Sequence, residues 1–123
     1  MNKDSEQRIK MVQDSNFLIS FNRIKERVLE INKANGWWDS ARNHYELIAL
    51  MHSELSEAVE AMRHGNQPSD HIPEFSGLEE ELADTIIRIM DMSASLNLKL
   101  GEAIIAKLAY NKGRGNRHGG KLA

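Results

Sequence analysis

The sequence predicts an all-α protein, a four-helix bundle in a single domain that covers residues 1–123. Apolar residues recur every three or four positions through most of the chain, which is the spacing of one face of an α-helix. Both prolines lie in one segment, and no alternation of Val, Ile or Thr indicates a strand. Four helical segments with mostly short connections are typical of a helix bundle.

The first helix is expected at residues 15–34. The pair Asn35-Gly36 follows it and is a common helix stop signal. Residues 1–14 either extend this helix or fray. Its apolar face is predicted from residues three or four positions apart: Phe17, Phe21, Ile24, Val28 and Ile31.

The second helix is expected to begin after Asn43. Together with Glu46, three residues later, Asn43 forms a capping-box pattern. The helix runs to about His64, and Gly65 ends it. Residues 65–77 hold both prolines and several small polar residues, so they are predicted to form a loop.

The third and fourth helices follow this loop. Ser76 and Glu79 form a second capping-box pattern, which predicts a helix over residues 78–95. A fourth helix is expected over residues 100–111. The remaining residues, 112–123, are rich in glycine and basic side chains and are predicted to be a mobile tail.

Composition favours a cytoplasmic protein. The chain has 123 residues, 41% of them apolar and 28% charged, with no cysteine and a net charge of −2. Without cysteine there is no disulfide framework and no thiolate metal site. The longest apolar run is five residues, from Leu47 to Met51, so no membrane span is expected.

The charges are unevenly distributed. Between Glu54 and Asp91 there are ten acidic residues and two basic ones, whereas five Lys or Arg and no acid follow from Lys107 onward. This distribution predicts bound cations in one region and bound anions in another. Solvated surfaces of opposite sign are the alternative reading.

Acidic residues fall on apolar faces of the second predicted helix. Glu54 lies inside its apolar stripe, and Glu57 lies at the edge of that stripe. Burial of an unpaired carboxylate costs several kcal/mol, so these side chains need a partner. The stripe is formed by Leu47, Met51, Leu55, Ala58 and Met62.

The third predicted helix carries a second acidic pair. It is apolar on two sides, and Glu81 and Asp84 are neighbours on the polar strip between them. Arg88 is the one basic residue in register, so most of the charge is left for a divalent cation. The alternative is that these acids are surface residues on helices of a different phase. All-oxygen ligation suits Mg²⁺, with Mn²⁺ as a substitute. A di-iron site of the ferritin type is excluded, because no glutamate has a histidine three residues later.

These acidic pairs carry a family resemblance. Glu54-Leu-Ser-Glu57 followed by Glu81-Leu-Ala-Asp84 resembles the ExxE…ExxD signature of the all-α nucleoside triphosphate pyrophosphatases, in particular the MazG-like nucleotide pyrophosphohydrolases. Related members are the dimeric dUTPases and dCTP pyrophosphatases. The stretch from Lys107 to Arg114 resembles the K-x-x-x-N-[KR]-x-R run of MazG-like members. The resemblance covers roughly residues 37–118. One departure is Ser53, where many MazG-like members carry a further glutamate.

The resemblance implies a reaction and a set of roles. Members hydrolyse a nucleoside triphosphate, NTP or dNTP, between the α and β phosphates, which gives a nucleoside monophosphate and pyrophosphate. Glu54 or Glu57 would also serve as the general base, and nucleotide-pool house-cleaning is the implied purpose. The implied Mg²⁺ ligands are Glu54, Glu57, Glu81 and Asp84, and the implied phosphate or sugar contacts are Lys107, Asn111, Lys112 and Arg114.

Several further side chains are assigned roles. Trp37 and Trp38 are expected to include a residue that stacks on the base, and packing at a helix junction is the alternative. Arg88 is expected either to reach a phosphate or to pin a metal ligand by a salt bridge. Asp91 is expected to be solvated or paired with Arg88, and an extension of the acidic strip toward the site is the alternative. Ordinary surface roles are expected for His52, His64 and His71.

The expected partners are the nucleotide substrate and further copies of the chain. A homodimer or homotetramer is expected, with apolar residues of the first and third helices in the contact. The alternative function is a non-catalytic helical module for oligomerisation or regulation. No nucleic-acid partner is expected, because the basic tail lacks a recognition helix or an aromatic platform.

Overall fold

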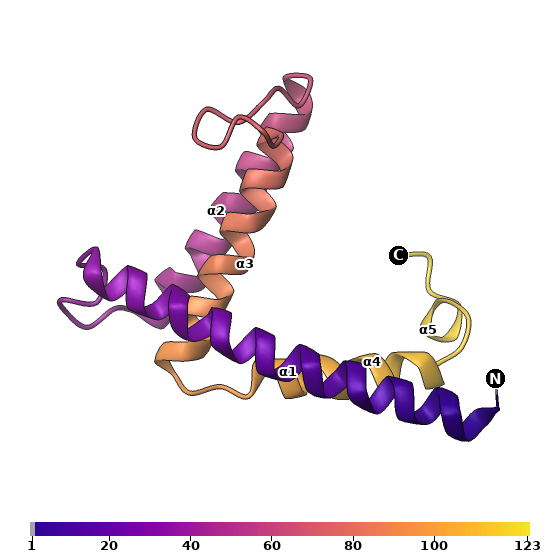
Figure 1. Cartoon of the computed structure of the whole chain (residues 1–123). Coiled ribbons are helices and arrows are strands. Elements are labelled where there is room, and N and C mark those ends of the chain that lie inside the picture. Colours follow the sequence, from indigo (N-terminus) through magenta and orange to yellow (C-terminus); the bar gives the residue numbers. More distant parts are fainter. Residues whose placement is uncertain (1) are drawn as a thin grey trace. The chain divides into compact units, whose positions relative to one another are not determined.

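The protein is all-α in a computed structural model that describes residues 2–123 (Figure 1). Within these residues there is no strand, and the one β-bridge pairs Pro68 with Ser76. None of the described helices is long and apolar enough to cross a membrane. The helices are α1 (Lys3–Ala34), α2 (His44–Arg63), α3 (Gly77–Ser95), α4 (Leu100–Gly113) and the short α5 (Arg117–Gly120).

The chain divides into two compact units. One unit comprises the chain up to Ile24 together with Asn97–Ala123, and the other comprises Lys25–Leu96. Helix α1 contributes its first part to one unit and its last part to the other. The helices confirm the predicted all-α class. The four-helix bundle and the single domain stay predictions.

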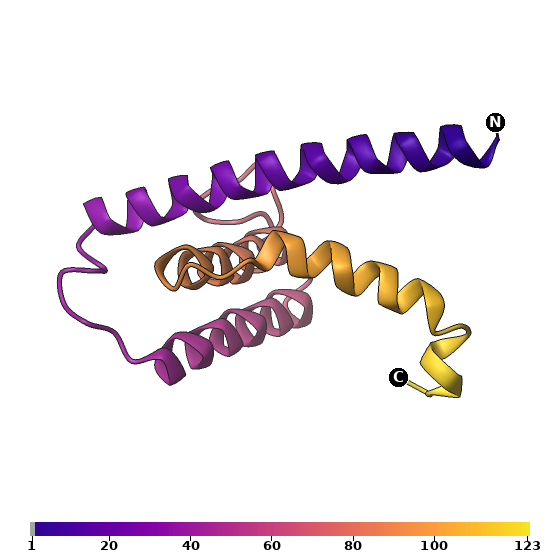
Figure 2. The same ribbon diagram turned by 90° about the horizontal axis from the view of Figure 1, so that it is seen from below.

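Helices α2 and α3 form an antiparallel hairpin in the unit Lys25–Leu96. The two helices lie side by side in both views of the ribbon (Figures 1 and 2). Small residues permit a close approach at the loop end, where a Cβ on Gly77 would lie 3.2 Å from that of Ala61. The hairpin buries Leu47 and Ala58 from α2 and Ala94 from α3. It is the framework that carries the predicted acidic pairs.

Side-chain caps fix where the two helices of the hairpin begin. The Asn43 side chain accepts hydrogen bonds from the backbone N–H groups of Tyr45 (2.8 Å) and Glu46 (3.2 Å). Ser76 and Glu79 form a reciprocal capping box at the start of α3. Each cap satisfies N–H groups that have no partner inside the helix. Both predicted helix starts are confirmed to within one residue.

Helix α1 differs from the prediction in length and in its buried face. It begins at Lys3, so most of the segment 1–14 extends the helix. Val28 and Leu29 are buried, whereas Ile24 and Ile31 are 45% and 55% exposed. The buried stripe thus lies to one side of the predicted apolar face. Since α1 has apolar residues on more than one side, spacing alone did not determine which side is covered.

In the other unit, α4 begins in close contact with α1. A Cβ on Gly101 would lie 3.2 Å from side-chain atoms of both Leu18 and Phe21, so only glycine allows this approach without displacing a neighbour. The rings of Phe17 and Phe21 pack with their centroids 5.4 Å apart. Helix α4 continues to Gly113, two residues beyond its predicted end.

Candidate metal and nucleotide site

Three carboxylates meet between α2 and α3. Glu54 comes from α2, and Glu81 and Asp84 come from adjacent positions on one side of α3. One carboxylate oxygen from each lies within 4.8 Å of the others, and all three side chains are half-buried. We call this group the acidic cluster. Its donor set, three oxygens on two rigid helices, fits a divalent cation such as Mg²⁺ or Mn²⁺.

The acidic cluster holds more negative charge than its surroundings balance. Burial, followed by a hydrogen bond and charge repulsion from Glu54, raises the pKa of Glu81 to about 7. Burial also raises the pKa of Asp84, and the charges of Glu54 and Glu80 add to the effect. Near neutral pH the cluster therefore retains a proton that free carboxylates would have lost.

Arg88 supplies the one ion pair within the acidic cluster. Its Nε and Nη2 atoms lie 3.0 and 2.9 Å from the same oxygen of Glu54. Of the two roles expected for Arg88, the structure therefore has the salt bridge to a predicted metal ligand. Arg88 therefore engages one of the three carboxylates, and the raised pKa values of Glu81 and Asp84 show that the cluster is not fully neutralised by it.

The fourth predicted ligand is not part of the acidic cluster. Glu57 is exposed on α2, and its carboxylate is absent from the group of converging oxygens in the described chain. Three residues advance a helix by about 300°, which places Glu57 about 60° around α2 from Glu54, and at that position its side chain is exposed. Ser53 is also exposed and donates its hydroxyl to the Leu50 carbonyl at 2.6 Å. The ligand role of Glu57 stays a prediction.

A pocket opens beside the acidic cluster within the same unit. Trp37 is 60% exposed, so one face of its indole is available to a flat ligand. Ile87 adds apolar surface, and Asn32 from α1 adds an amide. The full lining is Asn32, Trp37, Arg42, Glu54, Asp84, Ile87, Arg88 and Asp91. Acidic, basic and aromatic groups thus share one cavity.

Asp91 holds the wall of this pocket in place. The indole N–H of Trp38 donates to Asp91 at 2.9 Å, and Arg42 lies 3.5 Å from its other oxygen. Asp91 is 3% exposed, so the expectation that it is solvated or paired with Arg88 was wrong. Arg42 also covers the rings of Trp38 and Trp37, at 5.1 and 5.7 Å from their centroids. Trp38 is thus committed to packing, which leaves Trp37 for stacking.

Sequence reasoning missed the role of Arg42. The only signal was its position, four residues after Trp38 and just before the Asn43 cap. A basic side chain so close to a Trp pair allows a cation–π contact, but its carboxylate partner is 49 residues away along the chain.

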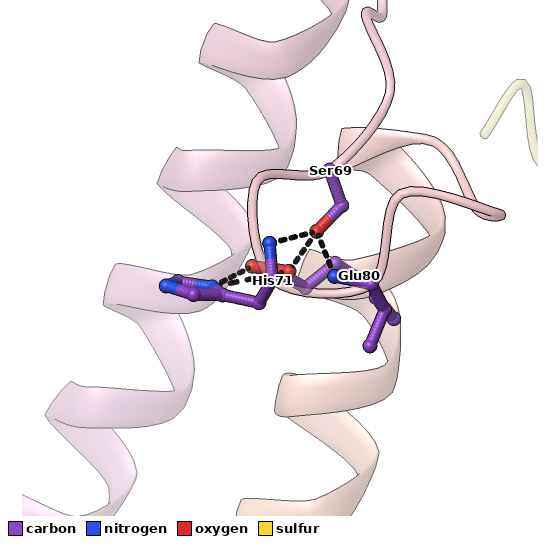
Figure 3. Close-up of polar contacts among 4 residues, drawn as sticks. Ser69, His71 and Glu80 are labelled. Carbon is purple, nitrogen blue, oxygen red and sulfur yellow. Dashed lines mark hydrogen bonds and ion pairs between the residues drawn. The ribbon is translucent and has the colours of Figure 1, made fainter.

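The loop between α2 and α3 contains a second polar network (Figure 3). The buried Ser69 hydroxyl donates to Glu80 and accepts from the backbone N–H groups of His71 and Ile72, both at 3.1 Å. His71 Nδ1 lies 3.0 and 3.3 Å from the two oxygens of Glu80. Hydrogen bonds from Ser69 and His71 lower the pKa of Glu80. His71 thus has a fixed partner, beyond the ordinary surface role expected for it.

The predicted basic contacts lie in the other unit, on α4 and just beyond it. Lys107 and Arg114 approach the ring of Tyr110, at 4.4 and 5.4 Å from its centroid. The side-chain oxygen of Asn111 is buried without a hydrogen-bond partner in the described chain, and Lys112 is exposed. In the described part of their unit, no cluster of metal-ligating side chains lies beside these residues. Their contacts with phosphate or sugar stay predictions.

Comparisons of the chain with protein-family models, with curated proteins and with solved structures gave no match. The resemblance to the MazG-like pyrophosphohydrolases therefore depends on the motif residues alone.

Proposed function

We propose that the protein is a Mg²⁺-dependent nucleoside triphosphate pyrophosphohydrolase. The observation that carries this proposal is the acidic cluster itself, in which Glu54, Glu81 and Asp84 converge with one arginine among them. A purely structural cluster would be expected to have its charges matched by nearby cations. These are three of the four residues that the MazG-like motif assigns to metal binding.

The donor set determines which cofactor suits the site. Glu54, Glu81 and Asp84 would hold Mg²⁺, or Mn²⁺ in its place, because hard divalent cations prefer carboxylate oxygens. The bound cation supplies charge neutralisation for the triphosphate and a lower pKa for an attacking water. Arg88 contacts only one of the two oxygens of Glu54, so the ion pair itself does not occupy the second oxygen. Glu54 or Glu57 accepts the proton of that water in this proposal.

The pocket next to the acidic cluster supports a nucleotide as the substrate. Trp37 offers an exposed aromatic face, and stacking on it tolerates any base. Asn32 and Arg42 offer hydrogen-bond donors to the base or sugar. House-cleaning of the nucleotide pool is part of the same proposal, because it follows from the family that the motif resembles.

Exposed apolar side chains support self-association as a dimer or tetramer. Met11, Val12 and Ile19 on α1 are 61%, 59% and 52% exposed, and Leu108 on α4 is 63% exposed. Large apolar side chains that are exposed together on one surface are typical of a protein contact. It also favours the second candidate function, a non-catalytic oligomerisation module. That module has no use for an acidic cluster.

The test is the release of pyrophosphate and phosphate from a panel of NTPs and dNTPs with Mg²⁺. We expect pyrophosphate rather than phosphate, no release with EDTA, and loss of release in Glu54→Gln. Glu60→Gln is the matched control, since Glu60 is an exposed glutamate on the same helix. Folded protein that binds no Mg²⁺ and turns over no nucleotide would contradict the proposal and leave the oligomerisation module.

A further inference from the structure

His71 is the second cationic side chain that acts on the acidic cluster. Its partner Glu80 is the immediate neighbour of Glu81, and the positive charge of His71 partly opposes the rise in the pKa of Asp84 that burial causes. His71, Glu80 and Glu81 also line one pocket, which lies at the loop end of the α2–α3 hairpin. The imidazole is therefore close to the predicted metal ligands without being one of them.

One nitrogen of the His71 ring is engaged and the other is available. Nδ1 contacts both oxygens of Glu80, and the side chain is 83% exposed. Within the described chain, Nε2 makes no hydrogen bond or ion pair. The hydrogen bond and charge of Glu80, with smaller effects from Asp70 and Asp84, raise the pKa of His71. The imidazolium form is thus favoured, and it carries a hydrogen-bond donor on Nε2.

The position of His71 is unusually well defined for an exposed side chain. Ser69, which is 6% exposed, accepts a hydrogen bond from the His71 backbone N–H, while Glu80 holds the ring. Figure 3 shows that the Ser69 hydroxyl and the His71 ring both contact the Glu80 carboxylate. Binding a ligand normally costs free energy because it fixes an exposed side chain in one conformation. The ring of His71 is already fixed by Glu80, so this cost is reduced.

We propose that His71 is a phosphate-binding residue, whose Nε2–H donates to a terminal phosphate oxygen of the nucleotide held at the acidic cluster. Glu80 is its positioning residue. This inference depends on the proposed function, because it needs a triphosphate at that cluster. A donor from His71 suits the pyrophosphate end, since His71 lines a pocket with Glu81, whereas Trp37 lines a different pocket with Glu54 and Asp84.

The role of His71 in the reaction is to stabilise charge. The oxygen of water forms a bond to the α-phosphorus while a proton of that water passes to Glu54 or Glu57, and the bond from the phosphorus to the bridging oxygen breaks. Pyrophosphate leaves with the bridging oxygen and its electron pair. His71 keeps its proton throughout and hydrogen-bonds to the departing group, whose negative charge increases.

The experiment uses inorganic pyrophosphate with Mg²⁺ as the probe and full-length protein. Calorimetry gives its affinity for wild type, His71→Gln and His64→Gln. His64 is the matched control, because it lines the same pocket and its ring lies 3.8 Å from a carboxylate oxygen of Glu60. We expect His71→Gln to weaken pyrophosphate binding about tenfold or more, the effect of one charge-assisted hydrogen bond. His64→Gln should stay within about twofold.

Nitrogen-15 NMR of the histidine rings gives a second measurement on the wild-type protein, so folding of the variant is not required. Pyrophosphate should shift the Nε2 resonance of His71 more than its Nδ1 resonance. Glu80→Gln should reduce pyrophosphate affinity less than His71→Gln does, because Glu80 acts through His71.

The outcomes separate this inference from the proposed function. If wild type releases pyrophosphate from nucleotides but His71→Gln binds the probe as tightly as wild type, the phosphate-binding role is overturned and the function stands. An unmoved Nε2 resonance at saturating probe overturns it as well. If wild type neither binds the probe nor releases pyrophosphate, the proposed function fails first, and this inference fails with it.

Discussion

Two acidic regions of α3 lie in opposite electrostatic surroundings. Near the end of the helix, Asp91 is almost fully buried and receives two donors, the Trp38 indole and the Arg42 guanidinium. Near its beginning, Glu81 faces the carboxylates of Glu54 and Asp84, and burial and repulsion raise its pKa to about 7.

The difference separates a structural acid from a candidate binding acid. A buried carboxylate that serves the fold is supplied with donors from the same chain, because an unpaired one is costly. Among the described residues Glu81 has no ion pair, so the fold tolerates this side chain by retaining a proton. A cation that replaces this proton would stabilise the region. The comparison therefore predicts opposite effects of mutation at the two positions.

The largest expected effect is on catalysis at Glu81. Glu81→Gln keeps the size of the side chain and removes its charge, so pyrophosphate release should fall by more than about a hundredfold, since even outer-shell partners of metal ligands contribute 10- to 100-fold. Initial rates with Mg²⁺ and the best nucleotide measure this effect. Glu60→Gln is the control. Near-wild-type rates in Glu81→Gln would remove Glu81 from the site.

Asp91→Asn should destabilise the fold by about 3 kcal/mol, because it leaves a guanidinium without its buried partner. Glu81→Gln should leave the free energy of unfolding of the metal-free protein unchanged or raise it. Urea denaturation of both variants without metal gives the two values. If both substitutions destabilise equally, the two acids do not differ in the way we describe.

The pH dependence of stability should carry the signature of Glu81. Its pKa is about 7 in the folded chain against an ordinary value of 4.5, so the fold binds this proton more tightly than the unfolded chain does. Without metal, the contribution of this protonated side chain to the free energy of unfolding is therefore full below about pH 4.5. It is lost as the pH rises toward 7. The raised pKa of Asp84 acts in the same direction.

Thermal unfolding between pH 5 and 8 tests this dependence, with Glu81→Gln as the reference that lacks the titrating group. The stabilisation by Mg²⁺ should grow over the same range, because the cation competes with the proton. The lowered pKa values of Glu79 and Glu80 act below about pH 4.5, outside this window. Identical pH profiles for the two proteins would contradict the prediction.

The smallest expected effect is at the loop. Ser69→Ala removes the hydroxyl that links Glu80 to the backbone of His71 and Ile72, and should reduce the free energy of unfolding by about 1–2 kcal/mol. Urea denaturation measures the change. A loss as large as that of Asp91→Asn would contradict this order. It would mean that the polar contacts of the loop stabilise this unit as much as those of Asp91 with Trp38 and Arg42.

The sequence predicted the helices well, because their ends are set by local chemistry. The Asn43 cap and the Ser76–Glu79 capping box depend on residues two or three positions apart. The extension of α1 to Lys3 was left open, since no cap residue favoured either outcome. Its buried face was predicted poorly because tertiary contacts chose among several apolar sides.

Three of the four predicted ligands converge because i, i+3 spacing and the antiparallel hairpin bring Glu81 and Asp84 opposite Glu54. Helical phase alone could not place Glu57, whose side chain is exposed on α2 and outside the cluster. The partners of Asp91 and His71 were missed for a different reason. Trp38 and Arg42 precede α2, and His71 lies in the loop between α2 and α3. The path of such segments in space cannot be predicted from residue spacing along one helix.

The most direct test of our account is a calorimetric titration of metal-free protein with Mn²⁺ and Mg²⁺ at pH 8. Wild type, Glu81→Gln and Glu57→Gln should be compared. We predict one or more bound cations in wild type, binding weakened at least about tenfold in Glu81→Gln, and nearly unchanged binding in Glu57→Gln, whose side chain is exposed. Equal binding by wild type and Glu81→Gln, or no binding by either, would contradict the claim that the acidic cluster is a metal site.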